Sequence, residues 1–432
     1  MREKVFANPV LIFILFFMGG WIGNFNGLSP AQAANVIEFP GLGGRSLGMG
    51  GVDIGIATDA SAMHSNPAGI TQIKGSRIDF GQGLYFPWIR FKNKENTFES
   101  SPHGREYEPF FFYIPHWGWV KHPADSPFSW GIGLFTQGGG GSRSDLKNKY
   151  YPEGKQIESQ MAFNKFTPTI AYQLTPRLSA GLALNVYYCP LSVKGVFGPA
   201  YIEVNDAKAW GAGYEVGFLY QPTDKLKMGI AYTSESMLED FDTDKGYMQI
   251  RMPGGGEISQ RTHAKVKDLQ TPQKVGIGIS YQFTPKLLAG IDAKWYDYSH
   301  TFRKLSVEMT GFPENNIDLR WKDSFNYAIG AEYKFTPRFA LRAGYSYTSE
   351  RVTPDEASLP YIPANNGNAH NLTAGFGYSW KNFLIDFGWS HNFDVQDGIR
   401  ESRIGEDYEN SSIGFGDDFF MTTLTWLFNT GS

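Results

Sequence analysis

The chain of 432 residues has one cysteine, no excess of basic residues and no long apolar run after residue 23. Each of these shortages excludes a class of protein. A single cysteine, Cys189, excludes a disulfide scaffold and a zinc site built from cysteines. The 39 basic and 43 acidic residues give a net charge of -4, whereas a nucleic-acid-binding protein carries a basic excess. After residue 23 no stretch has about 20 consecutive apolar residues, which excludes a bundle of transmembrane helices.

Glycine and aromatic residues are abundant: the chain has 50 glycines, and 16% of its residues are aromatic. The length allows two or three soluble domains or one large all-β domain. The mean hydropathy of -0.32 does not exclude a membrane β-barrel. A barrel strand exposes only every second side chain to lipid, so its average hydropathy stays polar.

The first 33 residues have the pattern of a secretory signal peptide. Arg2 and Lys4 precede the apolar residues 10–18, and Ala31-Gln32-Ala33 supplies small residues at a cleavage site. The alternative, an uncleaved membrane anchor, would need a longer apolar run. We therefore expect cleavage after Ala33 and export from the cytoplasm.

A turn motif recurs along the rest of the chain. Each copy has a tyrosine, then usually Thr-Pro or Thr-Asp, then a basic residue, which is a tight-turn signal between two strands. Proline cannot donate to a strand ladder and therefore belongs in the turn. The five copies lie at residues 172–177, 220–225, 281–286, 333–338 and, more loosely, 378–382, and we expect a sixth turn at 122–128.

Alternating apolar and small or charged residues flank these turns, which is typical of strands. The apolar face ends in aromatic residues, and outward apolar strands with terminal aromatic girdles are typical of membrane barrels. After the fourth turn, for example, one face carries Phe339, Leu341, Ala343, Tyr345 and Tyr347, and the other carries Ala340, Arg342, Gly344, Ser346 and Thr348. Glu332 and Arg342 then both face inward, and we expect them to form a salt bridge.

Six short turns join twelve strands, and one further strand at each end gives fourteen. We expect the first strand at about residues 76–90 and the last at about 417–428. The sequence thus predicts an all-β fold, a 14-stranded antiparallel transmembrane β-barrel over residues 76–432. We expect long exposed loops on the side opposite the turns, at residues 91–106, 138–158, 193–203, 238–268, 301–317, 352–366 and 396–416.

Residues 34–75 do not have the strand pattern, and we call them the hatch segment. They contain a glycine-rich stretch at 41–51 and the sequence Asn66-Pro67-Ala68. The glycines do not form a dinucleotide-binding fingerprint, because Ser46 stands at its last position and no strand precedes them. A 14-stranded barrel leaks unless its lumen is filled, so we expect this segment to plug the lumen.

Over almost the whole mature chain the sequence resembles the FadL-type outer-membrane transporters of long-chain fatty acids and hydrophobic compounds. The signal peptide, the Gly41-Leu-Gly-Gly-Arg45 start, Asn66-Pro67-Ala68 and the fourteen strands carry this resemblance. It implies that the hatch segment, including Asn66, Pro67 and Ala68, closes the lumen. It also implies passive uptake: a hydrophobic ligand binds in the barrel, the hatch moves, and the ligand leaves sideways into the membrane.

The resemblance further implies a kink in the third strand that opens the wall between strands three and four. We expect it near residues 133–141, at Gly133, Gly138 and Gly139, because glycines weaken a ladder and permit a bulge. The alternative for residues 138–141 is an ordinary flexible loop.

The resemblance also assigns a ligand carboxylate site. The family's aromatic-Lys-Asp motif matches Trp321-Lys322-Asp323, which implies that Lys322 binds the carboxylate, with Lys194 as the nearest second cation. The strand alternation predicts that Lys322 faces the lumen; the alternative is a solvated lysine at the rim. The family's Ile-Pro-Asp is Ile362-Pro363-Ala364 here, so the acidic residue is missing. Whether the ligand is a fatty acid with a carboxylate or a hydrocarbon therefore stays open.

The expected partners are such a ligand, outer-membrane lipid and lipopolysaccharide, and the barrel-assembly machinery, whose signal the last strand resembles apart from residues 429–432. We expect a monomer. The eight histidines lack metal-ligand spacing and no nucleophile elbow is present, so the sequence predicts no cofactor, no metal site and no enzyme. The alternatives are a general diffusion porin and, less favoured, an outer-membrane lipid hydrolase.

Overall fold

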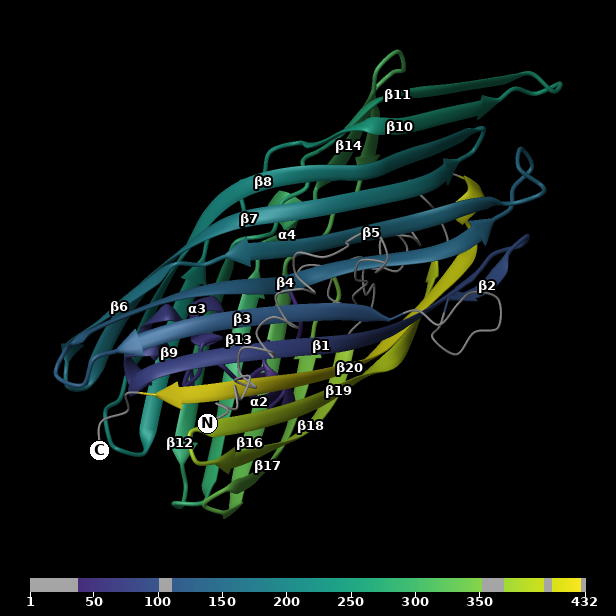
Figure 1. Cartoon of the computed structure of the whole chain (residues 1–432). Helices are drawn as coiled ribbons and strands as arrows, with labels where there is room; N and C mark the ends of the chain where they lie inside the picture. The colour runs from purple at the N-terminus through teal and green to yellow at the C-terminus, as the bar shows by residue number, and fades with distance from the viewer. Residues whose placement is uncertain (1–37, 101–110, 352–368, 400–405, 429–432) are drawn as a thin grey trace, which may run out of the picture. The chain divides into compact units, whose positions relative to one another are not determined.

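Antiparallel strands form a closed barrel in the computed structural model, which describes residues 38–100, 111–351, 369–399 and 406–428 (Figure 1). The described residues all belong to one compact unit, Ala31–Ser432. Strand β1 (Gly75–Lys92) pairs with β3 (Phe112–His122) on one side and with β20 (Ser411–Phe428) on the other, which closes the sheet. The predicted signal peptide and residues 362–364 lie outside the described residues.

Twenty strands make up fourteen spans within the described residues, as the sequence predicts, because six spans consist of two strands each. The other continuous spans are β4 (Phe128–Leu146), β7 (Leu178–Phe197), β8 (Ala200–Tyr220), β17 (Phe339–Thr348), β18 (Ala369–Trp380) and β19 (Phe383–Ile399). The interrupted spans are β2 (Thr97–Ser100) with β3, β5 (Lys155–Phe166) with β6 (Thr169–Thr175), β9 (Leu226–Thr233) with β10 (Phe241–Arg251), β11 (Glu257–Lys267) with β12 (Lys274–Gln282), β13 (Leu287–Tyr296) with β14 (Lys304–Met309), and β15 (Asn315–Asp318) with β16 (Ser324–Thr336).

All six predicted turns are present, and the repeated threonine explains the motif. The hydroxyl of Thr284 accepts hydrogen bonds from the backbone N–H groups of Lys286 (3.2 Å) and Leu287 (3.1 Å). The hydroxyl of Thr336 accepts from Arg338 and Phe339 in the same way. A threonine side chain thus satisfies the donors that a tight turn leaves unpaired.

The predicted long loops are wrong in extent, because several of them continue as strands. Only residues 198–199 connect β7 to β8, and most of 238–268 forms the hairpin of β10 and β11. Strand β4 likewise continues to Leu146. The polar and glycine content of these stretches also suits strands, because the ladder continues wherever neighbouring strands extend together. The predicted loop at 352–366 lies outside the described residues.

The outward and inward faces follow the predicted alternation. On β16 the outward residues Tyr327 and Ile329 are 52% and 55% exposed, whereas Ala328 between them is buried. On β13 the outward Ile291 precedes the buried Asp292. The exposed apolar side chains thus lie on the outer wall, and the buried charged side chains lie on the inner one. No helix in the described ranges is long and apolar enough to cross a membrane.

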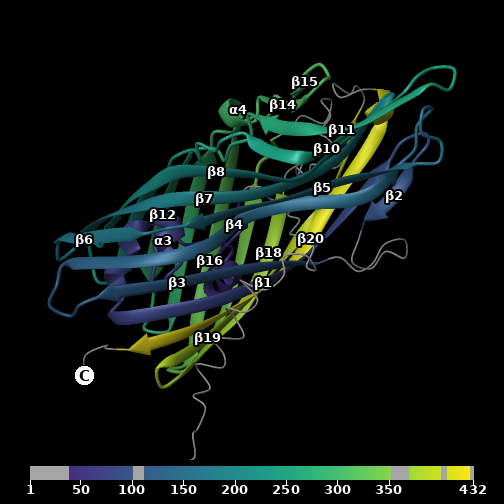
Figure 2. The ribbon, with the colours of Figure 1, turned by 45° about the horizontal axis from the view of Figure 1, so that its top comes forward.

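The described part of the hatch segment packs against the inner wall. It contains the short helices α2 (Gly44–Gly48), α3 (Ala62–Ser65) and η1 (Pro67–Gln72); α4 (Tyr298–Thr301) and η2 (Glu406–Tyr408) lie elsewhere. Helix α2 packs against β17 to β20, whereas η1 packs against β6, β7 and β8. Figure 1 shows α2 and α3 of the hatch segment, and Figure 2 shows α3, behind the front strands of the barrel. The hatch helices α2 and η1 contact spans on both sides of the lumen.

Glycines on the inner wall allow this packing, because the hatch backbone contacts the wall backbone directly. A methyl group at Gly330 of β16 would overlap the carbonyl oxygen of Met49. One at Gly229 of β9 would overlap the carbonyl oxygen of Ile54, and one at Gly217 of β8 would overlap the side chain of Asn66. We call these inward glycines the glycine row; its members on successive spans are Gly181, Gly217, Gly229, Gly278, Gly290, Gly330, Gly344, Gly375 and Gly388.

We predict that Gly330→Ala loosens the hatch segment, because the added methyl group displaces the backbone at Met49. Overpacking of this kind costs about 1–3 kcal/mol. In planar bilayers, open-channel events should become about tenfold more frequent, the factor that corresponds to about 1.4 kcal/mol. Gly398→Ala is the matched control, since a methyl group there meets no atom within 4 Å. Equal conductance of both variants would contradict the role of the glycine row.

Candidate functional site

The hatch segment is held by inward-facing polar side chains of the barrel. One carboxylate oxygen of Asp292 on β13 accepts hydrogen bonds from the backbone N–H groups of Asp53 (2.7 Å) and Ile54 (2.9 Å). Arg45 of α2 forms an ion pair with Glu332 of β16 at 3.1 Å, and Glu332 pairs with Arg342 of β17 at 2.8 Å. The predicted Glu332–Arg342 salt bridge is thus confirmed, and it extends to the hatch segment.

The predicted hatch motif Asn66-Pro67-Ala68 joins parts of the hatch segment to the wall. Asn66 is fully buried, and its Nδ2 donates to the carbonyl oxygens of Ile54 (2.9 Å) and Phe218 of β8 (3.1 Å). Its Oδ1 accepts from the backbone N–H of Ala68 at 3.2 Å, and Pro67 begins η1. An asparagine before a proline thus caps this helix and fixes it to the wall. The role of the motif in gating stays a prediction.

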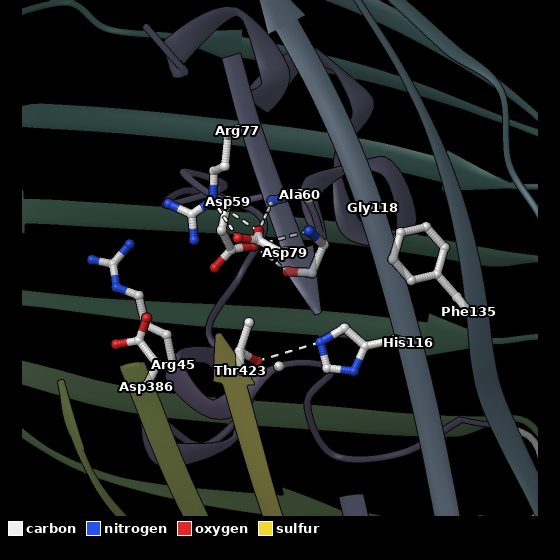
Figure 3. Close-up of a pocket in the computed structure, with 12 residues that line it drawn as sticks. Arg45, Asp59, Ala60, Arg77, Asp79, His116, Gly118, Phe135, Asp386 and Thr423 are labelled. Carbon is white, nitrogen blue, oxygen red and sulfur yellow. Dashed lines mark hydrogen bonds and ion pairs between the residues drawn. The ribbon is translucent and has the colours of Figure 1, made fainter. Parts of the chain in front are cut away.

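A small polar cavity lies where the hatch segment meets β1, β3 and β20, and we call its lining the polar seam (Figure 3). Asp79 of β1 accepts from the N–H of Ala60 (2.8 Å) and from the guanidinium of Arg77. His116 of β3 contacts the hydroxyl of Thr423 on β20 at 3.3 Å. The cavity, of about 10 Å³, has room for no more than one water molecule, so it cannot hold a ligand.

His64 of α3, which precedes the hatch motif, is buried and lies against the Phe135 ring at 6.1 Å between centroids. Burial lowers the pKa of its imidazole well below the usual range. The ring is therefore neutral at physiological pH, which favours a structural role over proton sensing.

Apolar side chains fill a second part of the lumen, and we call them the apolar cluster. They come from strands on several sides of the barrel and from the connections between them. The rings of Phe302 and Trp321 stack with centroids 4.4 Å apart and planes 14° apart. Its buried members include Phe163, Tyr187, Leu191, Leu238, Leu269, Tyr296, Tyr298, Phe302, Trp321 and Tyr408.

A row of polar residues adjoins the apolar cluster. Glu215 of β8, Thr233 of β9, Lys274 of β12 and Tyr296 of β13 are successive register partners, and we call them the polar row. Glu38 of the hatch segment pairs with Lys274 at 2.8 Å and accepts from the Tyr296 hydroxyl at 3.3 Å. The polar row therefore joins the apolar cluster, to which Tyr296 belongs, with the hatch segment.

The orientation predicted for Lys322 is wrong. Its side chain is exposed, whereas the adjacent Trp321 is buried in the apolar cluster. The alternation that placed Lys322 inward begins only at Ser324, the first residue of β16, and Arg320 has a positive φ of 43°, which interrupts the extended backbone. Its role as a carboxylate ligand stays a prediction without that support.

Lys194 on β7 is partly buried and already has partners. Its Nζ lies 3.1 Å from Glu158 and donates to Gln156 at 2.9 Å. The structure thus leaves Lys194 and Lys322 apart from the polar row, and their binding roles remain predictions.

Sequence reasoning missed the buried charges of the polar row and its neighbour Lys165 on β5. Lys165 and Glu215 are buried, and their ionic groups lie 3.9 Å apart. The alternation of β12 could have revealed Lys274. Ile277 and Ile279 are exposed on the outer face, so Lys274, an odd number of residues before each, faces inward.

The predicted kink region is strand and not a loop. Gly138 and Gly139 pair with Phe163 and Ala162 of β5, so the flexible-loop alternative is wrong. The register shifts between Thr136 and Gly138, which leaves Gln137 as the extra residue of a bulge. The carbonyl oxygen of Gln137 accepts a hydrogen bond from the N–H of Phe39 in the hatch segment at 2.9 Å.

Strand pairing stops early between the second span (β2 with β3) and the third span (β4). The sequence predicts the gap between the third span and the fourth (β5 with β6), which stay paired. Strands β4 and β5 pair as far as Leu146 and Lys155, whereas the last pair of β3 and β4 is His116 with Phe135. The next residue of β3, Pro115, has no N–H to continue a ladder. Gly133 lies within the paired part of β3 and β4, opposite Gly118. On its other side, its N–H donates to the carbonyl oxygen of Thr167, and its own carbonyl oxygen accepts from the N–H of Thr167. The lateral opening itself stays a prediction.

The chain is similar in sequence to outer-membrane proteins. A family model described as "Outer membrane protein transport protein (OMPP1/FadL/TodX)" matches residues 28–422. Outer membrane protein P1 of Haemophilus influenzae is 21% identical over 415 residues, which cover 84% of this chain and 87% of that protein. The long-chain fatty acid transport protein of Escherichia coli (strain K12) is 19% identical over 428 residues, which cover 89% and 92%.

The fold is similar to that of solved barrels. The Pseudomonas putida toluene transporter TodX superposes with a TM-score of 0.76 at 19% identity, over 91% of this chain and all of that one. The Ralstonia pickettii toluene transporter TbuX gives 0.72 at 20% identity, over 90% and 99%. At these identities the likeness supports the fold alone.

We predict that Asp292→Ala frees the hatch segment locally, because the N–H groups of Asp53 and Ile54 lose their buried acceptor. Leaving a buried donor unpaired costs about 1–3 kcal/mol, so amide exchange at these two residues should become roughly tenfold faster or more. Hydrogen-exchange mass spectrometry measures this. Asp292→Asn keeps an acceptor oxygen and should retain most of the protection; equal exchange in all three proteins would contradict the assignment.

Proposed function

We infer that this chain, which belongs to the outer membrane protein transport family (OMPP1/FadL/TodX), takes up hydrophobic small molecules by passive, hatch-gated transport. The protein is an outer-membrane transporter of hydrophobic compounds. Relatives are named for long-chain fatty acids and for toluene, so we propose long-chain fatty acids or hydrocarbons as ligands of this chain.

The observation that carries the proposal is a buried apolar cluster inside a barrel whose lumen also holds the hatch segment. An aqueous channel is lined by polar side chains, whereas Phe302, Trp321 and their neighbours offer an apolar medium. Each CH₂ group that moves from water into such a medium gains about 0.8 kcal/mol. A hydrophobic ligand that reaches the cluster is therefore held there, and a general diffusion porin is the less favoured alternative.

The polar seam disfavours a straight route through the barrel. To pass along the axis, an apolar molecule would have to separate Asp79 from Arg77 and from the N–H of Ala60 in the hatch segment without replacing these hydrogen bonds. Burying unpaired charge in this way is very unfavourable. A route out through the side of the barrel avoids that cost.

We propose that the ligand leaves between β3 and β4, beyond the last pair His116 and Phe135. Two features support this place: Pro115 cannot extend the ladder, and the bulge at Gln137 bends β4 next to it. Because Phe39 of the hatch segment is bonded to Gln137, a movement of the hatch would act directly on the opening. The ligand then enters the outer-membrane lipid.

Deleting Gln137 tests the lateral route, because it removes the extra residue and restores a regular β4–β5 register. We predict that uptake of radiolabelled palmitate by cells falls at least about tenfold, as expected for a barrier raised by about 1.4 kcal/mol. Palmitate binding to the purified protein should change little, since the apolar cluster is untouched.

Heat-modifiable migration in gels provides the folding control for this deletion. Undiminished uptake by a folded deletion variant would contradict lateral release. A parallel loss of binding would place the effect at the ligand site instead of the exit.

A further inference from the structure

Lys165 of β5 and Glu215 of β8 form an incompletely satisfied ion pair inside the lumen. Their side chains are 1% and 0% exposed, and the nearest Nζ–carboxylate distance is 3.9 Å. Within the described residues, Lys165 Nζ has no partner in hydrogen-bond geometry, and the carboxylate oxygens of Glu215 have only the nearby Thr233 side chain, which does not reach full hydrogen-bond geometry. Buried charges in native proteins are almost always hydrogen-bonded, because leaving them bare costs several kcal/mol. The pair thus lacks a polar group that completes it.

Three other buried carboxylates of the lumen each lie within 2.8 Å of a cationic partner. Glu38 has Lys274 at 2.8 Å, Glu332 has Arg342 at 2.8 Å, and Asp386 has Arg342 at 2.7 Å. The Glu38 and Glu332 contacts are charge-assisted hydrogen bonds, and the Asp386 contact is a close ion pair. The Lys165–Glu215 pair, at 3.9 Å, is more open than these three ion pairs.

The unsatisfied groups extend to the neighbouring span β7. Tyr187 is the register partner of Lys165 and belongs to the apolar cluster. In the described part of the chain, the Nδ2 of Asn185 is buried without a hydrogen-bond partner, and the Tyr187 hydroxyl has only the nearby Thr271 side chain, outside full hydrogen-bond geometry. The pair therefore lies beside the cluster, where the polar end of a molecule with an apolar tail would lie.

We propose that Lys165 and Glu215 bind the head group of an amphiphile whose uncharged end both accepts and donates a hydrogen bond, as the hydroxyl of a long-chain alcohol does. The Lys165 ammonium donates to the ligand oxygen, the ligand O–H donates to Glu215, and the chain lies in the apolar cluster. This deepens the proposed function and rests on it, since it names the ligand class of the same lumen.

The charges around the pair select the head group. Glu215 would repel a carboxylate that approached Lys165, which offsets the attraction of the lysine. Lys274, across Thr233 from Glu215, is already neutralised by Glu38. A hydrocarbon fills the cluster but leaves the pair bare, and a site built for hydrogen bonds discriminates strongly against such an analogue.

Equilibrium binding of radiolabelled hexadecanol, palmitate and hexadecane to the full chain in nanodiscs tests this. We expect hexadecanol to bind about tenfold more tightly than hexadecane, a difference that one satisfied buried polar pair can supply. In Lys165→Met, hexadecanol affinity should fall to near that of hexadecane, whose own affinity stays unchanged. In Glu215→Gln, palmitate should gain about tenfold, because Lys165 then has no competing anion.

Glu308→Gln is the matched control, since Glu308 forms a partly exposed pair with Lys267 at 2.5 Å and belongs to neither the apolar cluster nor the polar row; it should change none of the three affinities. Equal loss of alcohol and alkane binding in Lys165→Met, or equal binding of both by the wild-type chain, would overturn the head-group site. If the wild-type chain binds none of the probes, the proposed function itself fails. If Glu215→Gln does not fold, Lys165→Met alone decides.

Discussion

The direct contact between the hatch backbone and the glycine row is the constraint on which the rest of the structure depends. Side chains at Gly217, Gly229 or Gly330 would push the hatch segment away from the wall. With glycine at these positions, the backbone of the hatch segment lies against the wall. Asp292 of the wall then accepts from the N–H of Asp53, and Asn66 donates to the carbonyl oxygen of Ile54. A barrel of fourteen spans is otherwise wide enough to leak.

This filling divides the lumen into two chemical environments. Where the hatch segment meets the wall, charges such as Arg45, Glu332 and Asp79 are paired, which makes that part unfavourable to apolar molecules. Elsewhere aromatic rings such as Trp321 form the apolar cluster. The polar row, to which Glu38 connects the hatch segment, lies at the junction. The proposed ligand site and the hatch segment therefore share residues, which supports the proposed gating.

Local signals predicted much of the fold but less of the site. The turns were predictable because a Thr-Pro pair and a two-residue alternation act within a few residues, as the hydrogen bonds of Thr284 illustrate. The error at Lys322 arose where a positive φ at Arg320 broke the alternation, which no local pattern announced. Lys165 and Glu215 meet only because β5 and β8 enclose the same lumen, so their contact depends on closure of the barrel. The sequence showed that glycine is abundant. Which glycines contact the hatch segment could not be predicted, because these contacts form only when the barrel closes around it.

The central claim is that a hydrophobic ligand is held inside the barrel, in the apolar cluster, while the hatch segment closes the rest of the lumen. A crystal structure of the full chain soaked with 1-iodohexadecane tests this most directly, because anomalous scattering locates the iodine without reference to the fold. The account predicts an iodine peak beside Tyr298, Phe302 and Trp321. Iodine found only on the lipid-facing outer wall, with the cluster unoccupied, would contradict it.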